Sequence, residues 1–378
     1  MRHLVSLTHP TDETTAFEMG SKDITFDAKT EALDVAAHYA PQIKDRTIVV
    51  TGVNLLGLGF STVEALASQG PRVLVLTGRT ESKVQEVISK LSAQYPATKY
   101  VYLKLDLSSL AGARSAAEAL LSNDEVPQID ILVNNAGVSD FGLKAKLSPD
   151  GVESHFAVNH LAPFLFTNLV LPKLLAASRN NKAGATRIIN LSSEGHMYSG
   201  VRFSDINFVK LPSELPISER PNIEAIRKLF ANGYTDPGET YNPMAGYGQS
   251  KTANVLFSVG LNQRLYQRYG ILSLALHPGA VGTELSRGMD PATMKGLFEK
   301  WNELGLGEPK TLGQGSSTTL RCALDPEIGA PEEEQGKYKG VYWSDCQPAK
   351  AADWAVDGAL AEKLWAKSEE LAGQKFEY

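Results

Sequence analysis

Cysteine is scarce in this 378-residue chain, which contains only Cys322 and Cys346. Two cysteines cannot form a disulfide framework, and no Cys/His group has zinc spacing. An excess of one charge is also lacking: 37 Lys and Arg stand against 43 Asp and Glu, a net charge of −6. This balance argues against nucleic acid or an anionic membrane as the main partner.

No stretch approaches the roughly 18 uninterrupted apolar residues of a membrane span, and the first 20 residues lack the apolar core of a secretory signal. We therefore expect a soluble cytoplasmic protein.

Short apolar runs alternate with longer segments of helical period between about residues 45 and 290. This alternation predicts an α/β fold, in which helices wrap both faces of a doubly wound parallel sheet. The runs are almost continuously apolar, as in strands buried on both faces. Strands are expected over 47–51, 72–76, 100–105, 129–133, 187–191 and 271–276.

The flanking segments are less regular. Residues 1–44 indicate an N-terminal arm with one short helix near 30–39, and residues 45–378 a single domain. Within it, residues 197–246 contain five prolines, which is typical of a functional loop rather than an ordinary connection. An apolar stripe from Met294 to Leu304 predicts a helix packed on the body. Because it follows Thr283, a substrate lid over 288–310 is the alternative.

A glycine-rich turn, Thr51 to Gly59, joins the first strand to the first helix. Such glycines let the backbone approach a pyrophosphate at a helix N-terminus, although they also occur in plain connectors. The second strand ends in Arg79 without a carboxylate, which favours the 2′-phosphate of NADP over NAD, unless the arginine is merely solvated. Asp106, after the third strand, suits either an adenine amino group or a helix cap.

Tyr247 and Lys251 lie four residues apart on a predicted helix, so both side chains project from one face. A nearby cation favours the phenolate and brings the phenol closer to proton transfer at neutral pH. Elsewhere, Pro163 has no N–H for the carbonyl of Asn159. That carbonyl is then free to hold a water molecule, unless the proline only bends a packing helix.

These motifs together resemble the short-chain dehydrogenase/reductases, a family with a Rossmann-like fold. The matching segments are the Thr51–Gly59 turn, Asn134-Asn-Ala-Gly137, Ser192-Ser193, the Tyr247/Lys251 pair and Pro278-Gly279. They occur in the family's order, and the resemblance covers about residues 45–290. Asn159-His-Leu, the wide gap between Ser193 and Tyr247, and residues 340–347 (GVYWSDCQ) are similar to the retinol-dehydrogenase-like branch, especially its fungal members.

The resemblance implies a role for each matching residue. Tyr247 would be the general acid/base, and Lys251 would hold the nicotinamide ribose and lower the pKa of the tyrosine. Ser193 would hydrogen-bond the substrate oxygen, and Asn159 would anchor a water relay to Lys251. The residues implied in cofactor binding are Gly52, Asn54, Gly57, Leu58, Gly59, Arg79, Asp106, Leu107, Asn135, Ala136, Gly137, Tyr247, Lys251, Pro278, Gly279, Val281 and Thr283.

One departure from the family pattern lies in the glycine turn. Four residues, Val53 to Leu56, separate Gly52 from Gly57, where the family commonly has three. Related fungal sequences usually place a glycine at the position of Leu56. A side chain there would limit backbone approach to the phosphates if its φ were positive.

We expect an NADP(H)-dependent oxidoreductase of the EC 1.1.1 type that interconverts a carbonyl and an alcohol on a small organic, secondary-metabolite substrate. The alternatives are a non-redox isomerase, dehydratase or cyclase, and a catalytically idle NADPH-binding protein. No metal is expected, since His155, His160, His196 and His277 have no zinc spacing. The helices at 151–177 and 247–269 resemble the family's dimer-forming pair, which leaves a homodimer open.

Overall fold

A computed structural model describes residues 25–230, 238–283 and 309–378, together with residues 285, 295, 296, 299, 300 and 303. Its centre is a sheet whose first six strands are all parallel and run in the order β3-β2-β1-β4-β5-β6. The order reverses between β1 and β4, which confirms the predicted doubly wound α/β fold. The strands are β1 (Thr47–Val50), β2 (Val73–Gly78), β3 (Lys99–Lys104), β4 (Ile131–Asn134), β5 (Thr186–Leu191) and β6 (Ile271–His277).

Two further strands extend the sheet beyond β6, and the sequence did not reveal them. β9 (Tyr342–Ser344) pairs parallel to β6, and β10 (Gln347–Pro348) pairs antiparallel to β9. They are too short to show a periodic pattern. A separate hairpin of β7 (Glu332–Glu334) and β8 (Lys337–Lys339) precedes them.

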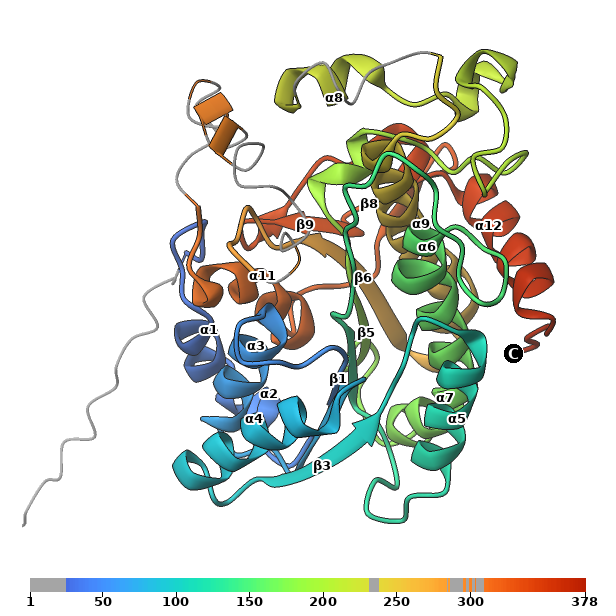
Figure 1. Ribbon diagram of the computed structural model, residues 1–378. Coiled ribbons are helices and arrows are strands. Elements are labelled where there is room, and N and C mark those ends of the chain that lie inside the picture. The colour runs from blue at the N-terminus through green and yellow to red at the C-terminus, as the bar shows by residue number, and fades with distance from the viewer. Residues whose placement is uncertain are drawn as a thin grey trace, which may run out of the picture.

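Helices of one layer cover the face of the sheet that carries Ile48, Val50 and Leu74 (Figure 1). They include the predicted helix of the N-terminal arm, whose Val35 is fully buried in this core, and a second short helix that was not predicted, whose Ile43 is equally buried. The apolar spacing along α4 likewise turns Val84 inward. This layer contains α1 (Ala32–His38), α2 (Ala40–Ile43), α3 (Leu58–Ala67), α4 (Glu81–Gln94) and α11 (Leu312–Leu324).

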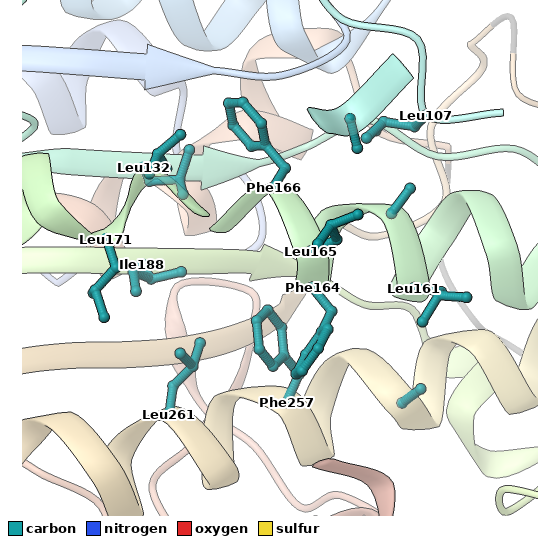
Figure 2. Close-up of a cluster of buried hydrophobic side chains, with 14 of the residues drawn as sticks. Leu107, Leu132, Leu161, Phe164, Leu165, Phe166, Leu171, Ile188, Phe257 and Leu261 are labelled. Carbon is teal, nitrogen blue, oxygen red and sulfur yellow. The ribbon is translucent and has the colours of Figure 1, made fainter. Parts of the chain in front are cut away.

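The opposite layer consists of α5 (Leu110–Leu121), α6 (Ser154–Phe156), the π-helical turn η1 (Ala157–Leu161), α7 (Ala162–Ser178) and α9 (Pro243–Tyr269). Figure 2 shows Phe164 of α7 and Phe257 of α9 facing each other, and their ring centroids are 5.4 Å apart. The stretch Ser154–Ser178 is long and apolar enough to cross a membrane by length and composition, yet 72% of its most apolar window is buried inside the protein. Its hydrophobicity therefore serves the core.

A last helix, α12 (Gly358–Ala372), packs on the outside of α7 and α9 after the short turn η7 (Asp353–Ala355) (Figure 1). Trp365 of α12 is 3% exposed and meets Phe164 edge-on at 5.0 Å between centroids. Its indole leaves room only for a glycine at position 260, where a Cβ would approach it to 3.1 Å. Arg264 of α9 stacks on the same indole and pairs with Glu362. Together these contacts attach α12 to the outer face of the two helices.

The proline-rich segment 197–246 is only partly irregular. It begins at the last residue of η2 (Glu194–Met197) and contains η3 (Pro212–Glu214), η4 (Ile217–Glu219) and α8 (Ile223–Leu229), a helix that fits between Pro221 and residue 230. Its apolar residues form a small core of their own around Phe208 and Tyr241. The predicted stripe from Met294 to Leu304, and with it most of the expected lid, lies outside the described residues.

Candidate active site

A cavity of about 560 Å³ lies at the carboxyl ends of the parallel strands. Residues that follow each of the six strands line it, from Gly52 after β1 to Gly279 after β6. In doubly wound sheets, ligands bind at this edge, where the strand order reverses. The expected residues in its lining are Gly52, Asn54, Gly57, Leu58, Arg79, Asp106, Leu107, Asn135, Ala136, Gly137, Ser193, Tyr247, Lys251, Pro278, Gly279, Val281 and Thr283.

The glycine turn crosses close to the end of β4. Gly52 has φ +71°, and a Cβ there would lie 2.7 Å from the Cα of Ala136. Asn135 closes the crossing, since its Nδ2 donates to the carbonyls of Thr51 at 2.7 Å and Gly52 at 3.2 Å. The turn thus has the close backbone approach that a phosphate cradle requires.

The structure differs from the expected role of Gly59 and decides the conditional point about Leu56. Gly59 is buried in the first turn of α3 rather than in the cavity lining: a Cβ there would lie 2.7 Å from the carbonyl oxygen of Gly52, so its role is packing. Leu56 has no positive φ, and its side chain is 64% exposed. The side chain at position 56 therefore adds no left-handed strain to the turn.

The far end of the cavity, beyond β2, carries positive charge. Arg79 is exposed there, and no hydrogen bond or ion pair to another described residue engages its side chain. Thr80 and Lys83, which the sequence analysis missed, line the same end. The Thr77 hydroxyl is buried in the lining without a hydrogen-bond partner among the described residues. These groups suit a ligand that brings both negative charge and polar atoms.

Asp106 serves the loop after β3. Its Oδ1 accepts hydrogen bonds from the backbone N–H and the hydroxyl of Ser108, at 3.0 and 2.7 Å. The N-cap of α5 is Ser109, not Asp106. Asp106 therefore stabilises the turn before the helix while it also lines the cavity, so the adenine contact stays a prediction.

Ser193, Tyr247 and Lys251 converge at the other end. The hydroxyl of Ser193 accepts from the N–H of Gly195 at 3.1 Å, and the ring of Tyr247 lies against the same glycine. The Nζ of Lys251 lies 5.5 Å from the centre of the Tyr247 ring and donates to the carbonyl of Leu191 at 3.0 Å. The predicted spacing on α9 thus does place the phenol and the ammonium on one face.

Burial dominates the protonation of this pair. It raises the pKa of Tyr247 above 10.0, while the hydrogen bond from Ser193 acts in the opposite direction. Lys251 is not among the causes of this shift, so the lowering expected from it stays a prediction. Burial also lowers the pKa of Lys251 to about 8, because desolvation disfavours the charged form of each group. At neutral pH the pair is a phenol beside an ammonium, and the phenol holds a proton to donate.

Asn159 lies in the π-helical turn η1, and Pro163 follows four residues later in α7. Its Oδ1 accepts from the N–H of Val138 at 2.7 Å, and its Nδ2 donates to the carbonyl of Val138 at 3.0 Å and to Ser250 at 2.9 Å. A Cβ at Gly137 would lie 3.3 Å from that Oδ1 and 3.4 Å from the Nζ of Lys251. The side chain therefore fixes the loop after β4, and the water relay through the backbone carbonyl stays a prediction.

His196 supports Ser193 from behind. Its Nδ1 lies 2.7 Å from the carbonyl oxygen of Ser193, and its Nε2 accepts from the N–H of Ala352 at 3.1 Å. Burial lowers the pKa of His196 to about 4. A neutral imidazole thus ties the serine loop to the segment that follows β10.

The loop after β6 carries Pro278, Gly279, Val281 and Thr283 into the lining. Gly279 has φ +88°, and a Cβ there would lie 2.6 Å from the Cδ of Lys310. Lys310 also donates its backbone N–H to the carbonyl of Ala280 at 2.8 Å. A side chain at position 279 would therefore collide with the segment that braces the loop.

The wall beside Tyr247 is largely apolar, and sequence reasoning missed it. It consists of Val138, Phe141, Tyr198, Phe230, Met244 and Leu285. Four of these side chains belong to or pack against the small core of the 197–246 segment. Met244 lies in the first turn of α9, and the other five lie in irregular segments, where no local sequence pattern predicts which side chains reach the cavity.

The histidines do not form a metal site. Among the described residues, no three His, Cys, Asp or Glu side chains lie close enough together to hold an ion. His160 lies in the aromatic core between α7 and α12, where its Nε2 is 2.8 Å from the hydroxyl of Ser368. Burial lowers its pKa to about 3.

Comparison with known proteins identifies the family. The sequence model of the family described as short chain dehydrogenase matches residues 46–204. The oxidoreductase fscI of Fusarium equiseti is 36% identical over 255 residues, which are 67% of this chain and 94% of that protein. Retinol dehydrogenase 12 of Mus musculus is 32% identical over 89% of both chains. Among solved structures, the Pseudomonas aeruginosa RhlG/NADP active-site complex has a TM-score of 0.54 at 21% identity, covering 84% of this chain and 96% of that one.

The chain belongs to the short-chain dehydrogenase/reductase family, and its relatives include retinol dehydrogenases. Membership in this family of oxidoreductases supports an enzyme that uses a nicotinamide cofactor. The cradle at Gly52, the unpartnered hydroxyl of Thr77 and the positive end at Arg79 fit such a dinucleotide.

Proposed function

We propose that the protein is an NADP(H)-dependent oxidoreductase of the EC 1.1.1 type that interconverts a carbonyl and an alcohol. One observation carries the proposal. Ser193, Tyr247 and Lys251 meet at one end of a single cavity whose other end, three strands away, presents Arg79. A nicotinamide dinucleotide extended along the strand ends would join the two ends.

The cofactor, when bound, supplies or accepts the hydride. The protein's own groups manage the proton and the orientation. The Ser193 hydroxyl and the Tyr247 ring both lie against Gly195, and Ser193 acts on the pKa of the phenol, so one substrate oxygen can lie against both hydroxyls. Tyr247 then donates its proton to that oxygen as negative charge develops there, which avoids a free alkoxide. In the reverse direction Tyr247 accepts the proton.

Lys251 contributes positive charge next to the phenol. With a pKa of about 8, it is mostly protonated at pH 7. Its ammonium favours the phenolate that Tyr247 becomes after giving up its proton. The same ammonium would hydrogen-bond the hydroxyls of the nicotinamide ribose, as the family resemblance implies.

The preference for NADP(H) rests on the end of β2. Arg79 stands there in the lining together with Thr80 and Lys83. An acidic residue at this point would accept hydrogen bonds from the ribose hydroxyls of NAD, whereas an arginine pairs with a 2′-phosphate. Between Thr77 and Lys83 the one carboxylate is that of Glu81, and it does not line the cavity. No acidic side chain of this described stretch is therefore placed to bind the ribose hydroxyls of NAD.

The substrate we propose is a small apolar carbonyl compound or alcohol. Its support is the wall of Phe141, Tyr198, Phe230 and Met244 beside Tyr247, since apolar and aromatic walls bind ligands by excluding water from both surfaces. A secondary-metabolite substrate and a cytoplasmic location stay predictions. The cytoplasmic location agrees with two buried cysteines that form no disulfide.

Substitution of Tyr247 by Phe tests the proposal. It removes the hydroxyl and keeps the ring, so NADPH affinity should stay nearly unchanged while turnover falls by roughly 100-fold or more. Turnover is followed as loss of NADPH absorbance with a panel of apolar aldehydes and ketones. Full turnover in the variant would remove Tyr247 from the mechanism.

The same assay separates the alternatives. A non-redox isomerase, dehydratase or cyclase would convert its substrate without NADPH loss, and an idle NADPH-binding protein would bind the nucleotide and convert none of the panel. Leu56, whose side chain would limit backbone approach to the phosphates if its φ were positive, has no positive φ.

A further inference from the structure

Three buried polar side chains, Glu153, His155 and Tyr241, form a hydrogen-bonded cluster beside the catalytic tyrosine. Glu153 and His155 are both 0% exposed. The Oε1 of Glu153 lies 3.0 Å from the Nδ1 of His155 and accepts from the hydroxyl of Tyr241 at 3.2 Å. Glu153 also caps α6, because its carboxylate accepts the backbone N–H groups of His155 and Phe156. The reaction outlined above uses none of these side chains.

The cluster reaches the cavity wall through one bond. The Nε2 of His155 accepts the backbone N–H of Asp140 at 2.8 Å. Asp140 lies between Ser139 and Phe141, and both neighbours line the cavity. Together with the Asn159 bonds to Val138, this bond attaches the wall segment 138–141 at two points.

The cluster also contacts Tyr247 directly. The His155 ring meets the Tyr247 ring edge-on, with centroids 6.0 Å apart. Gly246 precedes Tyr247, and a Cβ there would lie 3.1 Å from the Tyr241 hydroxyl and 3.3 Å from the Nδ1 of His155. The imidazole of His155 thus contacts Tyr247, the proposed proton donor, and also holds the wall segment 138–141.

The hydrogen-bond pattern defines the state of His155. Its Nε2 faces an N–H donor, so Nε2 carries no proton. Its Nδ1 faces a carboxylate, so the proton is at Nδ1. An imidazolium would place an N–H against the N–H of Asp140 and lose that bond. The charged or titratable groups around the ring are Glu153, Tyr241, Tyr247 and Asp140, the last paired with Lys146.

We propose that His155 is a positioning residue that sets substrate affinity: as the neutral Nδ1–H tautomer, oriented by Glu153 and Tyr241, it holds the 138–141 wall at its distance from Tyr247. The inference deepens the proposed carbonyl reduction and rests on it. The wall is apolar at Val138 and Phe141, so it binds the body of the substrate. The nucleotide lies on the other groups of the cavity and does not depend on this bond.

Two substitutions each keep one of the two hydrogen bonds of the His155 imidazole and remove the other. In His155→Gln, the amide reaches the position of Nε2 and can accept from Asp140, while Glu153 loses its bond to the imidazole and keeps its other donors. In His155→Asn, the shorter amide lies near the position of Nδ1 and can donate to Glu153, while Asp140 loses its acceptor. His38→Asn, on the outer face of α1, is the matched control.

We expect the KM for an apolar carbonyl substrate to rise about 10-fold in His155→Asn and to change less than about 3-fold in His155→Gln, because one unpaired buried donor costs about that much. The Kd for NADPH should stay unchanged in both. The melting temperature should fall more in His155→Gln than in His155→Asn, since His155→Gln removes the imidazole hydrogen bond from the fully buried carboxylate of Glu153. A residue with a structural role alone would move KM and melting temperature together, and that result would overturn the proposal.

Amide exchange of Asp140, measured by NMR on the protein without substrate, gives a test independent of activity. The N–H should exchange at the wild-type rate in His155→Gln and at least about 10-fold faster in His155→Asn, since it loses its acceptor. Unchanged protection in His155→Asn would refute the positioning role. If wild type reduces no carbonyl, the proposed function fails, and the exchange data still decide whether His155 holds the wall.

Discussion

Replacement of Arg79 by Ala tests the cofactor preference most directly. Arg79 is exposed at the end of β2, without a hydrogen bond or ion pair to another described residue. A phosphate at the ribose 2′ position would therefore gain its bond without breaking another. NADH lacks that phosphate, so the variant should bind it as wild type does.

The expected loss follows from the exposure. A hydrogen bond to a charged partner contributes about 1.5–3 kcal/mol, and an exposed ion pair about 0.2–1 kcal/mol. Arg79 would make a charge-assisted contact at the cavity mouth, between these cases, so we expect a loss of about 1–2 kcal/mol. That corresponds to a Kd for NADPH about 5- to 30-fold higher. Because the site is open to solvent, the difference should shrink at 0.5 M salt.

The assay is a fluorescence titration of NADPH and of NADH at low and high salt. Lys90→Ala removes the same charge from α4, the helix that follows Arg79, outside the cavity lining, and should leave both affinities unchanged. Equal weakening of NADPH and NADH by Arg79→Ala would show a general disturbance of the site. An unchanged Kd for NADPH would show that no 2′-phosphate meets Arg79. Either result would refute the reasoning.

Three further predictions concern packing and pH. Gly195→Ala would place a Cβ 2.8 Å from Cε1 of the Tyr247 ring. It should lower kcat about 10-fold or more by moving the phenol; kcat within twofold of wild type would contradict this. His160 has a folded pKa of about 3, below its unfolded value of about 6.5, so the unfolded chain binds the extra proton as the pH falls between them. The free energy of unfolding therefore falls as the pH drops through that window. His160→Phe should reduce the slope of this free energy against pH by up to about 1.4 kcal/mol per pH unit, measured by urea unfolding from pH 6.5 to 4. An unaltered slope would be inconsistent with a neutral buried His160. Trp365→Ala should lower the free energy of unfolding by about 3–5 kcal/mol, and a loss below about 1 kcal/mol would show that α12 adds little stability.

The fold was predictable wherever a pattern is local. The six parallel strands each have their own apolar run, and Tyr247 and Lys251 share a face because of helix geometry alone. The N-terminal helix at Ala32–His38 also had a recognisable spacing. By contrast, β9 is three residues long and becomes a strand only because it pairs with β6. Pairing with a distant strand leaves no trace in so short a segment.

The candidate site divides in the same way. Motif residues such as Ser193 and Gly52 line the cavity where their strand ends place them. The wall residue Phe230 and the support residue His155 depend on how the 197–246 segment packs, which residue types do not encode locally. The pKa of Tyr247 was expected to fall, yet it rises. Burial decides that direction, and it is a property of the folded chain.

The position of α12 bears on self-association. This helix covers the outer face of α7 and α9 with Trp365, and its Glu362 pairs with Arg264. A second copy approaching those two helices would have to displace a segment tethered to the same chain, which competes at a far higher effective concentration than any free molecule. We therefore expect that a pair of copies does not form through α7 and α9, so that Trp365→Ala, and not dilution of the wild type, changes any association through this face.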